Sequence, residues 1–513
     1  MSNISNESRP KYARLIFKNS LFNMLRYLVI LVIMVLLTPF IFKKLGAKLY
    51  GVWSLILVFS NVPSMLELGA GTALLKFIPE IKSDGNDTNL NQLINFVIMF
   101  YALIGFVSLL ILFLFKTWII TNILKADMSN FAEVNFVFSL SLLVAWFSFV
   151  LASYTLILMG FQRFDLFAIV VIMECVVRSG LTFLFLEYGW GLKGLVFAGI
   201  GGLVTTWIMG HYFIKIVFSS FKLGLLWSSV RKFGRAVLSY GIKMAIPGIV
   251  LWQQFDKAFL GYFLNSTMVG YYQLGNSLAK QFRNLPDYLV YPIFPTACEL
   301  NACDDKKRIK ELYFQTQKYN FLILLPLFFL GFIFAPLIIQ LWLGKGLNLV
   351  VLTFRVFLAA YFIFQTSVPS NIILNAIGFP QEGMKASILS AIIILVLCPL
   401  FISEYGFAGA LFSVAISIIA FSVWVQWIFY FKAEVSFVRM LKECFSLPAI
   451  VVILLGTILI FVNHFTTVSL LYKALAGLFF TAFYFIIIWL SSHFNPNEKQ
   501  RMKNGLRNWL GLS

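Results

Sequence analysis

The sequence predicts an all-α integral membrane protein with about fourteen transmembrane helices, arranged as two parallel six-helix repeats and a C-terminal helix pair. Composition, recurring apolar runs and an internal repeat support this prediction. Of the 513 residues, 60% are hydrophobic and only 12% are charged, about half the charged fraction of soluble domains. Apolar runs of 18 or more residues recur along the chain, and each can cross about 30 Å of hydrocarbon as a helix.

The apolar runs place the spans at 17–42, 49–77, 91–115, 133–159, 165–186, 192–218, 241–264, 267–296, 317–343, 348–377, 385–403, 406–431, 446–463 and 470–490. With a cytoplasmic N-terminus, the inner loops and their flanks carry 26 of the 40 Lys and Arg residues, and the outer loops carry 8. An excess of positive charge on the inner side is the usual pattern in membrane proteins. We therefore expect a multi-pass protein with both termini in the cytoplasm.

Three short motifs recur in the same order. Leu45–Leu55 recurs as Leu264–Leu274 at an offset of 219, Gly160-Phe161 as Gly378-Phe379 at 218, and Glu187–Gly189 as Glu404–Gly406 at 217. Each motif occupies the same place in the count of spans. Because six spans is an even number, both copies enter the membrane from the same side, which predicts a parallel repeat.

The repeat sets the predicted domain boundaries. They are an N-terminal six-helix bundle (1–218), a cytoplasmic amphipathic linker (219–240), a C-terminal six-helix bundle (241–432), helices thirteen and fourteen (433–490) and a basic amphipathic tail (491–513). The linker mixes aromatic and aliphatic residues with Arg231, Lys232 and Arg235. This mixture is typical of a helix in the headgroup plane of a membrane, although a plain solvated linker is the alternative.

Ionisable residues within spans are costly in lipid, so they indicate a water-filled path or a paired site. The eighth span has a stripe of polar and ionisable residues on one helical face, namely Gln273, Asn276, Ser277, Lys280, Arg283, Asn284 and Asp287. Spans one, two and seven have shorter stripes. The candidate substrate-binding residues are Arg26, Lys257, Lys280, Arg283, Asn23, Gln253 and Asn284, and the candidates for ion coupling are Glu67, Asp256 and Asp287.

These polar stripes have two interpretations. They either hydrogen-bond between packed helices or line an aqueous cavity between the two halves. We favour the cavity because the polar spans are the first two of each repeat, and equivalent helices of a parallel repeat approach the same axis. Glu174 and Arg178, spaced i,i+4, indicate a local ion pair, whereas Arg355 either extends toward the membrane surface or lines the cavity.

The sequence argues against several other classes of protein. It has no phosphate-binding loop and no HExxH motif, and the five cysteines form no CxxC pair, so we expect neither an enzyme nor a metal or cofactor site. The net charge of +19 is explained by the basic inner loops, so we expect no nucleic-acid partner. A transporter is the remaining class that fits a cavity within so many spans.

The segments Lys44–Trp53 and Leu66–Phe77 resemble the start of Wzx-type polysaccharide flippases, which transport lipid-linked oligosaccharides. These flippases are polysaccharide transporters of the multidrug/oligosaccharidyl-lipid/polysaccharide (MOP) superfamily, which also contains the MATE transporters. The resemblance implies two six-helix bundles around a cationic cavity that opens alternately to each side. By position, Arg26, Lys257, Lys280 and Arg283 would be the cavity cations.

The resemblance also implies a substrate and a place in the cell. The substrate would be an undecaprenyl-diphosphate-linked oligosaccharide, a repeat unit of O-antigen, capsule or exopolysaccharide, exported across the bacterial plasma (inner) membrane. Membrane lipids, a glycan polymerase and glycosyltransferases would be its partners. The alternatives are a lipid II flippase or a cation-coupled drug exporter of the same superfamily, and a non-transporting scaffold for glycan assembly.

Overall fold

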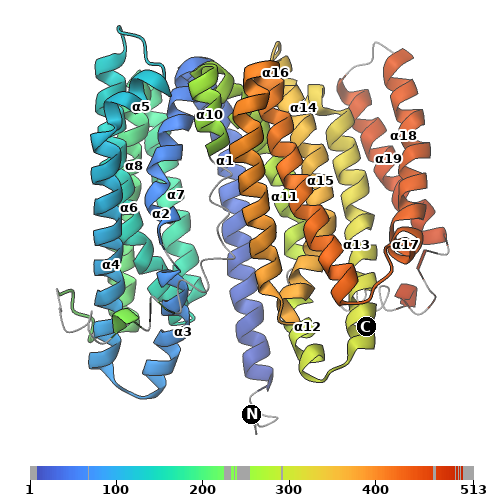
Figure 1. Cartoon of the computed structure of the whole chain (residues 1–513), viewed down its shortest axis with the longest axis horizontal. Helices are drawn as coiled ribbons and strands as arrows, with labels where there is room; N and C mark the ends of the chain where they lie inside the picture. The colour runs from blue at the N-terminus through green and yellow to red at the C-terminus, as the bar shows by residue number, and fades with distance from the viewer. Residues whose placement is uncertain are drawn as a thin grey trace. The chain divides into compact units, whose positions relative to one another are not determined.

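The computed structural model describes residues 9–67, 69–224, 233–235, 237, 239, 255–290, 293–465, 470–491, 493, 494, 496 and 498–500. Within these residues the regular structure is helical throughout (Figure 1). The chain divides into two compact units. The first contains Met1–Gln273 and Cys398–Ala410, and the second contains Leu274–Leu397 and Leu411–Ser513.

Most of the first unit consists of long helices joined by short turns. Its helices are α1 (Arg9–Ser60), α2 (Val62–Met65), α3 (Ala70–Ser83), α4 (Asp87–Leu114), α5 (Lys116–Asn122), α6 (Phe131–Gly160), α7 (Phe164–Glu187), α8 (Gly191–Val217), α10 (Phe255–Phe263) and the beginning of α11 (Ser266–Val290). Glycines bring α8 close to α7. A Cβ atom at Gly202 would lie 2.9 Å from Oε1 of Glu174, and one at Gly194 would lie 2.8 Å from Cβ of Phe185. Small residues at such contacts let helix backbones approach closely in a membrane.

The second unit contains the rest of α11 and the helices that follow it. These are α12 (Ile293–Ala302), α13 (Lys306–Ile333), α14 (Ala335–Leu343), α15 (Asn348–Ala376), α16 (Pro380–Lys432), α17 (Phe437–Met440), a π-helical turn (Leu441–Phe445), α18 (Ser446–Phe465) and α19 (Leu470–Leu490). Its core joins α13, α15, α16 and the C-terminal pair, with Tyr313, Phe321, Phe429 and Tyr484 almost fully buried.

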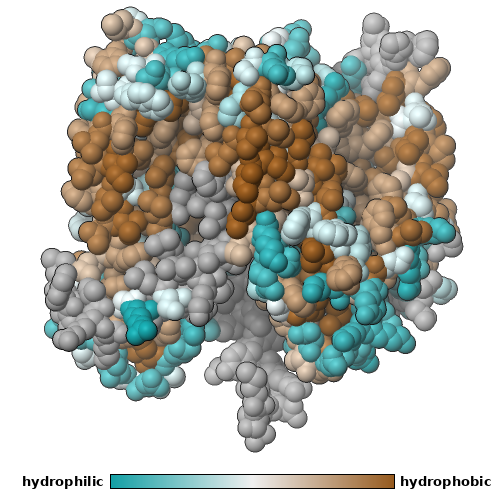
Figure 2. Space-filling view, in the orientation of Figure 1, coloured by the Kyte–Doolittle hydropathy of each residue, from teal (hydrophilic) through white to brown (hydrophobic). Residues whose placement is uncertain are grey.

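Ten described helices are long and apolar enough to cross a membrane. Two of them contain a sharp break, at Gly46 and at Gly406, so each holds two consecutive spans. The all-α membrane fold is confirmed, and these helices are compatible with the expected fourteen spans. Figure 2 shows hydrophobic side chains over the middle of the long helices and hydrophilic ones near their ends, as a bilayer requires.

The repeated motifs occur where helices end. Gly46 has φ of +73° and Gly406 has φ of +57°, and Gly189 and Gly378 also have positive φ values. Glycine adopts this backbone region without the steric cost that a side chain adds. The second copy of the first motif has no glycine there, and Asn265 instead separates α10 from α11.

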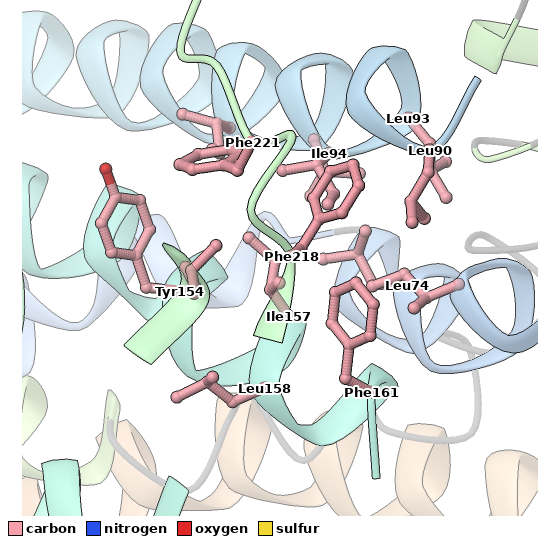
Figure 3. Close-up of a cluster of buried hydrophobic side chains, with 14 of the residues drawn as sticks. Leu74, Leu90, Leu93, Ile94, Tyr154, Ile157, Leu158, Phe161, Phe218 and Phe221 are labelled. Atoms are coloured by element: carbon pink, nitrogen blue, oxygen red, sulfur yellow. The ribbon is translucent and has the colours of Figure 1, made fainter. Parts of the chain in front are cut away.

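The start of the linker packs against the first unit. Ser220 donates to Asp87 at 2.6 Å, and the side chain of Asn95 bonds both the Lys222 carbonyl and the Gly224 N–H. Phe221 is fully buried in the core cluster that Figure 3 shows. This part of the linker therefore contacts protein, while Arg231 and Lys232 lie outside the described residues.

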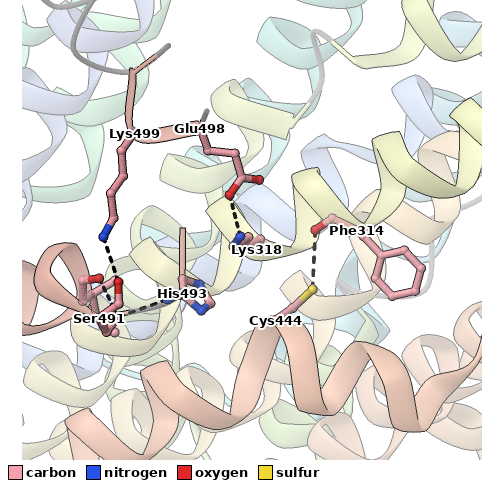
Figure 4. Close-up of polar contacts among 8 residues, drawn as sticks. Phe314, Lys318, Cys444, Ser491, His493, Glu498 and Lys499 are labelled. Atoms are coloured by element: carbon pink, nitrogen blue, oxygen red, sulfur yellow. Dashed lines mark hydrogen bonds and ion pairs between the residues drawn. The ribbon is translucent and has the colours of Figure 1, made fainter. Parts of the chain in front are cut away.

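The described part of the C-terminal tail contacts the second unit (Figure 4). The Lys318 ammonium lies 2.8 Å from the Glu498 carboxylate, and both side chains are mostly buried. Next to them, His493 is buried, and its Nε2 atom has no hydrogen-bond partner among the described residues. The remainder of the predicted tail helix, from residue 501, lies outside the described residues.

Candidate functional site

The polar stripe of the eighth predicted span is on α11. Contacts with α15 of the second unit distinguish one edge of this stripe from the other. At about 100° per residue, Asn276, Arg283 and Asp287 lie within about 40° of one another on one edge. All three contact α15: the Tyr361 hydroxyl donates to Asn276 at 2.9 Å, and the Gln365 amide donates to Asp287 at 3.0 Å. This edge of the stripe is therefore paired within the bundle.

Arg283 lies among aromatic and polar groups. Its guanidinium carbon is 5.2 Å from the ring centre of Tyr361 and 5.4 Å from that of Phe364. The guanidinium also donates to the side-chain oxygen of Asn284 at 3.3 Å. Cation–π contacts of this kind hold a positive charge in place while its side chain stays half-buried. The Gln365 amide also contacts the Arg283 carbonyl.

The other edge of the stripe holds Gln273, Lys280 and Asn284. All three side chains are half-buried, and Lys280 lies about 40° from Asn276 around the helix axis. Just beyond this edge, the hydroxyl of Ser277 donates to the Leu274 carbonyl of its own helix. This second edge carries the predicted substrate-binding residues Lys280 and Asn284.

The acidic candidate on α10 is a buried structural group. Asp256 is 1% exposed and accepts hydrogen bonds from the Tyr272 hydroxyl and from the backbone N–H of Lys257. Lys257 is itself 9% exposed. The bond from Tyr272 therefore connects Asp256 of α10 to the start of α11. Gln253 lies outside the described residues.

The candidates of the first two spans lie in the first unit. The Arg26 guanidinium of α1 is 4.7 Å from the ring centre of Phe167 on α7, and Asn23 is half-buried one turn earlier. Glu67 lies between α2 and α3, where Gly69 has φ of +70°. Its Oε1 atom accepts from the Tyr101 hydroxyl at 2.6 Å and from the Gly71 N–H at 3.1 Å.

Three further ionisable residues were singled out in the sequence. The Arg178 guanidinium lies 2.9 Å from Oε1 of Glu174, which confirms the local ion pair. Arg355 donates to the Phe332 carbonyl at 3.1 Å and is half-buried.

The partners of these candidates escaped the sequence reasoning. Tyr101, Tyr272 and Gln365 are polar residues inside apolar runs, and each bonds a candidate residue 16 to 78 positions away in the chain. Tyr361 bonds Asn276 of the same polar stripe, 85 positions away. Their presence within predicted spans was a usable signal. Their pairing depends on helix contacts that the sequence pattern does not specify.

The set has a clear chemical capacity. Arg26 on α1 and Lys280 and Arg283 on α11 are cations within predicted membrane spans. Such cations can replace the water that a diphosphate loses when it leaves solvent. The assignment of these residues to substrate binding stays a prediction.

Comparisons with known proteins identify the family. Residues 45–351, more than half of the chain, match the model of the family described as polysaccharide biosynthesis protein. The chain is 20% identical over 417 residues to a putative O-antigen transporter of Shigella flexneri, covering 81% of this chain and 97% of that protein. It is also 20% identical over 248 residues to a probable low-salt glycan biosynthesis flippase, Agl15, of Haloferax volcanii, covering 48% and 51% of the two chains.

Solved structures share the fold at low sequence identity. The lipid II flippase MurJ in an inward closed conformation superposes with a TM-score of 0.69 at 13% identity, over 91% of this chain and 98% of that one. An inward-facing multidrug resistance MATE transporter of the MOP superfamily superposes at 0.62 with 13% identity, over 77% and 94%. The expected fold, the resemblance to polysaccharide flippases and the expectation of a transporter rather than an enzyme are confirmed. This chain belongs to the polysaccharide biosynthesis protein family of membrane transporters.

Proposed function

We propose that this transporter is a flippase that exports an undecaprenyl-diphosphate-linked oligosaccharide from the inner to the outer leaflet of a bacterial plasma membrane. The repeat unit would belong to O-antigen, capsule or exopolysaccharide. The family match over residues 45–351 carries the proposal. A glycan polymerase and glycosyltransferases would be the neighbouring partners in this pathway.

The cations suit the diphosphate of such a substrate. The diphosphate and sugars would move past Arg26, Lys257, Lys280 and Arg283, with Asn23, Gln253 and Asn284 as polar contacts, while the polyprenyl tail stays in lipid. Positive charges that exchange for water around the phosphates reduce the cost of crossing the hydrocarbon. Alternating access then moves the polar headgroup without opening a continuous pore.

The membrane potential can drive this export. Taking the diphosphate as two negative charges that leave a negative interior, the potential contributes about 2.3 kcal/mol per charge and per 100 mV. No coupled ion is then required. Glu67, Asp256 and Asp287 stay candidates for proton coupling, although Asp256 is almost fully buried.

The test is transport by purified protein in proteoliposomes with fluorescent undecaprenyl-diphosphate oligosaccharide. We expect Lys280→Glu and Arg283→Glu to abolish export while the protein stays folded, because each replaces an attractive charge by a repulsive one. Arg355→Glu is the matched control, since this half-buried cation bonds a carbonyl of its own unit. Full export by the Lys280→Glu, Arg283→Glu double variant would remove the role of the cations.

The same vesicles separate the alternatives. Collapsing the potential with an ionophore should slow export, and an unchanged rate would reject the electrical driving force. Preferential movement of lipid II or of a cationic drug would identify the other members of the superfamily. A protein that moves none of these substrates, and whose cation variants still support glycan assembly in cells, would be a scaffold.

A further inference from the structure

The first unit encloses a polar cavity that no candidate residue above accounts for. Its volume is about 420 Å³, and all its lining residues belong to α1, α2, α6, α7 and α8 or to the short turn before α2. This volume lies within the range of small-molecule sites in proteins. Exposed lining side chains, including Ser148 and Asn61, show that the cavity is open on one side.

The wall of the cavity carries many hydroxyl groups for a helical bundle in lipid. Ser141, Ser148 and Thr155 come from α6, and Thr206 comes from α8. Ser141 is only 5% exposed, and its hydroxyl oxygen has no hydrogen-bond partner among the described residues. A buried hydroxyl without a partner is costly, so this group points to a polar occupant of the cavity.

The ionisable groups of the wall cancel each other. Glu174 and Arg178 both line the cavity, and their side chains are 2.9 Å apart. The wall therefore has no net charge to attract a phosphate or a bare cation. The described residues also contain no group of three His, Cys, Asp or Glu side chains that could hold a metal ion.

The remaining chemistry fits a neutral ligand with several hydroxyl groups. Serine and threonine hydroxyls both donate and accept hydrogen bonds, and the paired Glu174 and Arg178 offer further acceptors and donors. Trp53 and Phe149 add aromatic surface to the same wall, and aromatic rings pack against apolar C–H faces while polar groups bond the rim. A sugar ring presents both kinds of surface.

We propose that this cavity binds a sugar residue of the glycan headgroup and so selects among lipid-linked glycans. The proposal rests on the proposed function, because the sugar is taken to be part of the exported substrate. The cavity acts separately from the cations of α1 and α11, which would contact the diphosphate. Selection by hydroxyl contacts is steep, because a wrong sugar leaves buried polar groups unpaired.

The test is protection of a cysteine in the cavity wall. Ser148→Cys is introduced with Cys303→Ser, which removes the exposed native thiol, and the full-length protein is placed in nanodiscs. The probes are undecaprenyl-diphosphate oligosaccharide from the producing cells and undecaprenyl diphosphate without sugar. We expect the oligosaccharide lipid to slow maleimide labelling of Cys at position 148 at least fivefold, and the sugar-free lipid to leave it unchanged.

Variants then separate binding from packing. Ser141→Ala and Thr206→Val should abolish the protection because each removes a cavity hydroxyl. Ser153→Ala is the control: this buried serine of α6 does not line the cavity. Its hydroxyl donates to the Val150 carbonyl of its own helix, as that of Thr206 does to Gly202, and the variant should keep the protection. Equal protection by both lipids, no protection by either, or protection that survives both cavity variants would overturn the sugar site.

Transport by the unmodified protein keeps the two proposals apart. Protein that exports the oligosaccharide lipid without protecting position 148 would refute the sugar site alone. Protein that protects position 148 but exports nothing would refute the flippase function while the sugar site stands.

Discussion

Glu67 occupies a helix break inside the second predicted span. Its carboxylate accepts from Tyr101 of α4 at 2.6 Å and from the Gly71 N–H at 3.1 Å. Gly71 has no space for a side chain, since a Cβ atom there would lie 2.7 Å from the Tyr101 hydroxyl. The Glu67 carboxylate therefore connects the turn before α3 to α3 itself and to α4.

We expect Glu67→Ala to lower the free energy of unfolding by about 1–3 kcal/mol, because two donors lose their acceptor. Glu67→Gln keeps an acceptor oxygen and should cost less than about 1 kcal/mol. Denaturant unfolding of purified protein in detergent measures both. Glu80→Ala, at an exposed site on α3, is the control, and equal stability of the two alanine variants would argue against the bridge.

His493 gives the C-terminal contact a pH dependence. Burial, with a smaller contribution from the Lys318 ammonium, lowers the pKa of His493 to about 4, against the opposing effect of Glu498. A histidine with a lowered pKa stabilises the folded state in its neutral form. That contribution is complete above the unfolded pKa of about 6.5 and is lost as the pH falls toward 4.

The unmodified protein should therefore lose thermal stability faster than His493→Gln between pH 7 and pH 4.5. The glutamine variant has no titrating group at this position. Melting temperatures of both proteins in one detergent, measured across this range, give the comparison. Parallel curves would show that protonation of His493 does not weaken the contact of the tail.

Sequence reasoning identified single polar residues better than their partners. The stripe on α11 was visible from helical spacing, and the i,i+4 spacing of Glu174 and Arg178 predicted their contact. The two edges of the stripe were not separable, because Tyr361 and Gln365 lie on a helix whose rotation against α11 depends on packing. The cavity around Ser141 was missed for the same reason, since its lining residues come from five helices whose packing the sequence pattern does not specify.

At the scale of helices, the internal repeat predicted local structure. Gly51 and Gly270 are equivalent at the offset of 219, and they also lie against each other. A Cβ atom at Gly270 would lie 2.6 Å from the Ala47 carbonyl oxygen, and one at Gly51 would overlap the Ser266 carbonyl. The two copies of the motif thus form a reciprocal close contact, which their shared glycine permits.

Gly51→Ala and Gly270→Ala should each destabilise the protein by about 1–3 kcal/mol, the usual cost of overpacking. Gly180→Ala on α7 is the matched control, because no atom lies within 4 Å of its added Cβ. Alanine favours helix by about 1 kcal/mol over glycine, so this variant should be neutral or stabilising. The yield of purified protein and its denaturant unfolding measure the stability of all three variants. A Gly51→Ala variant as stable as the unmodified protein would contradict the close contact.

Prolines were less informative than glycines about helix ends. Pro39, Pro286 and Pro369 lie inside helices without ending them. In the second predicted span, by contrast, α1 ends at Ser60 and Pro63 lies in the first turn of the short helix α2. Proline removes one hydrogen bond, and a membrane helix tolerates this loss when neighbours satisfy the free carbonyl. The described helices are compatible with the spans predicted from hydropathy, whereas the prolines do not by themselves mark the ends of helices.

At the scale of the whole molecule, charge and hydropathy act together. The apolar middle of the helices fixes where the bilayer lies, and the excess of Lys and Arg in alternate loops predicts which side faces the cytoplasm. The direction of transport depends on this orientation. The membrane potential drives a negative headgroup outward, so it favours export only if the substrate is loaded on the cytoplasmic side.

A native cysteine can report that orientation. Cys303 is exposed in the turn between α12 and α13, a loop that the fourteen-span topology places in the cytoplasm. A membrane-impermeant maleimide should therefore label it in inside-out vesicles and leave it unlabelled in intact spheroplasts. Met128→Cys, at a 95% exposed site in the predicted outer loop after α5, should show the opposite pattern in a Cys303→Ser background. If both positions react from the same side, the number of spans between them is even rather than the predicted five, and the predicted topology and direction of export are wrong.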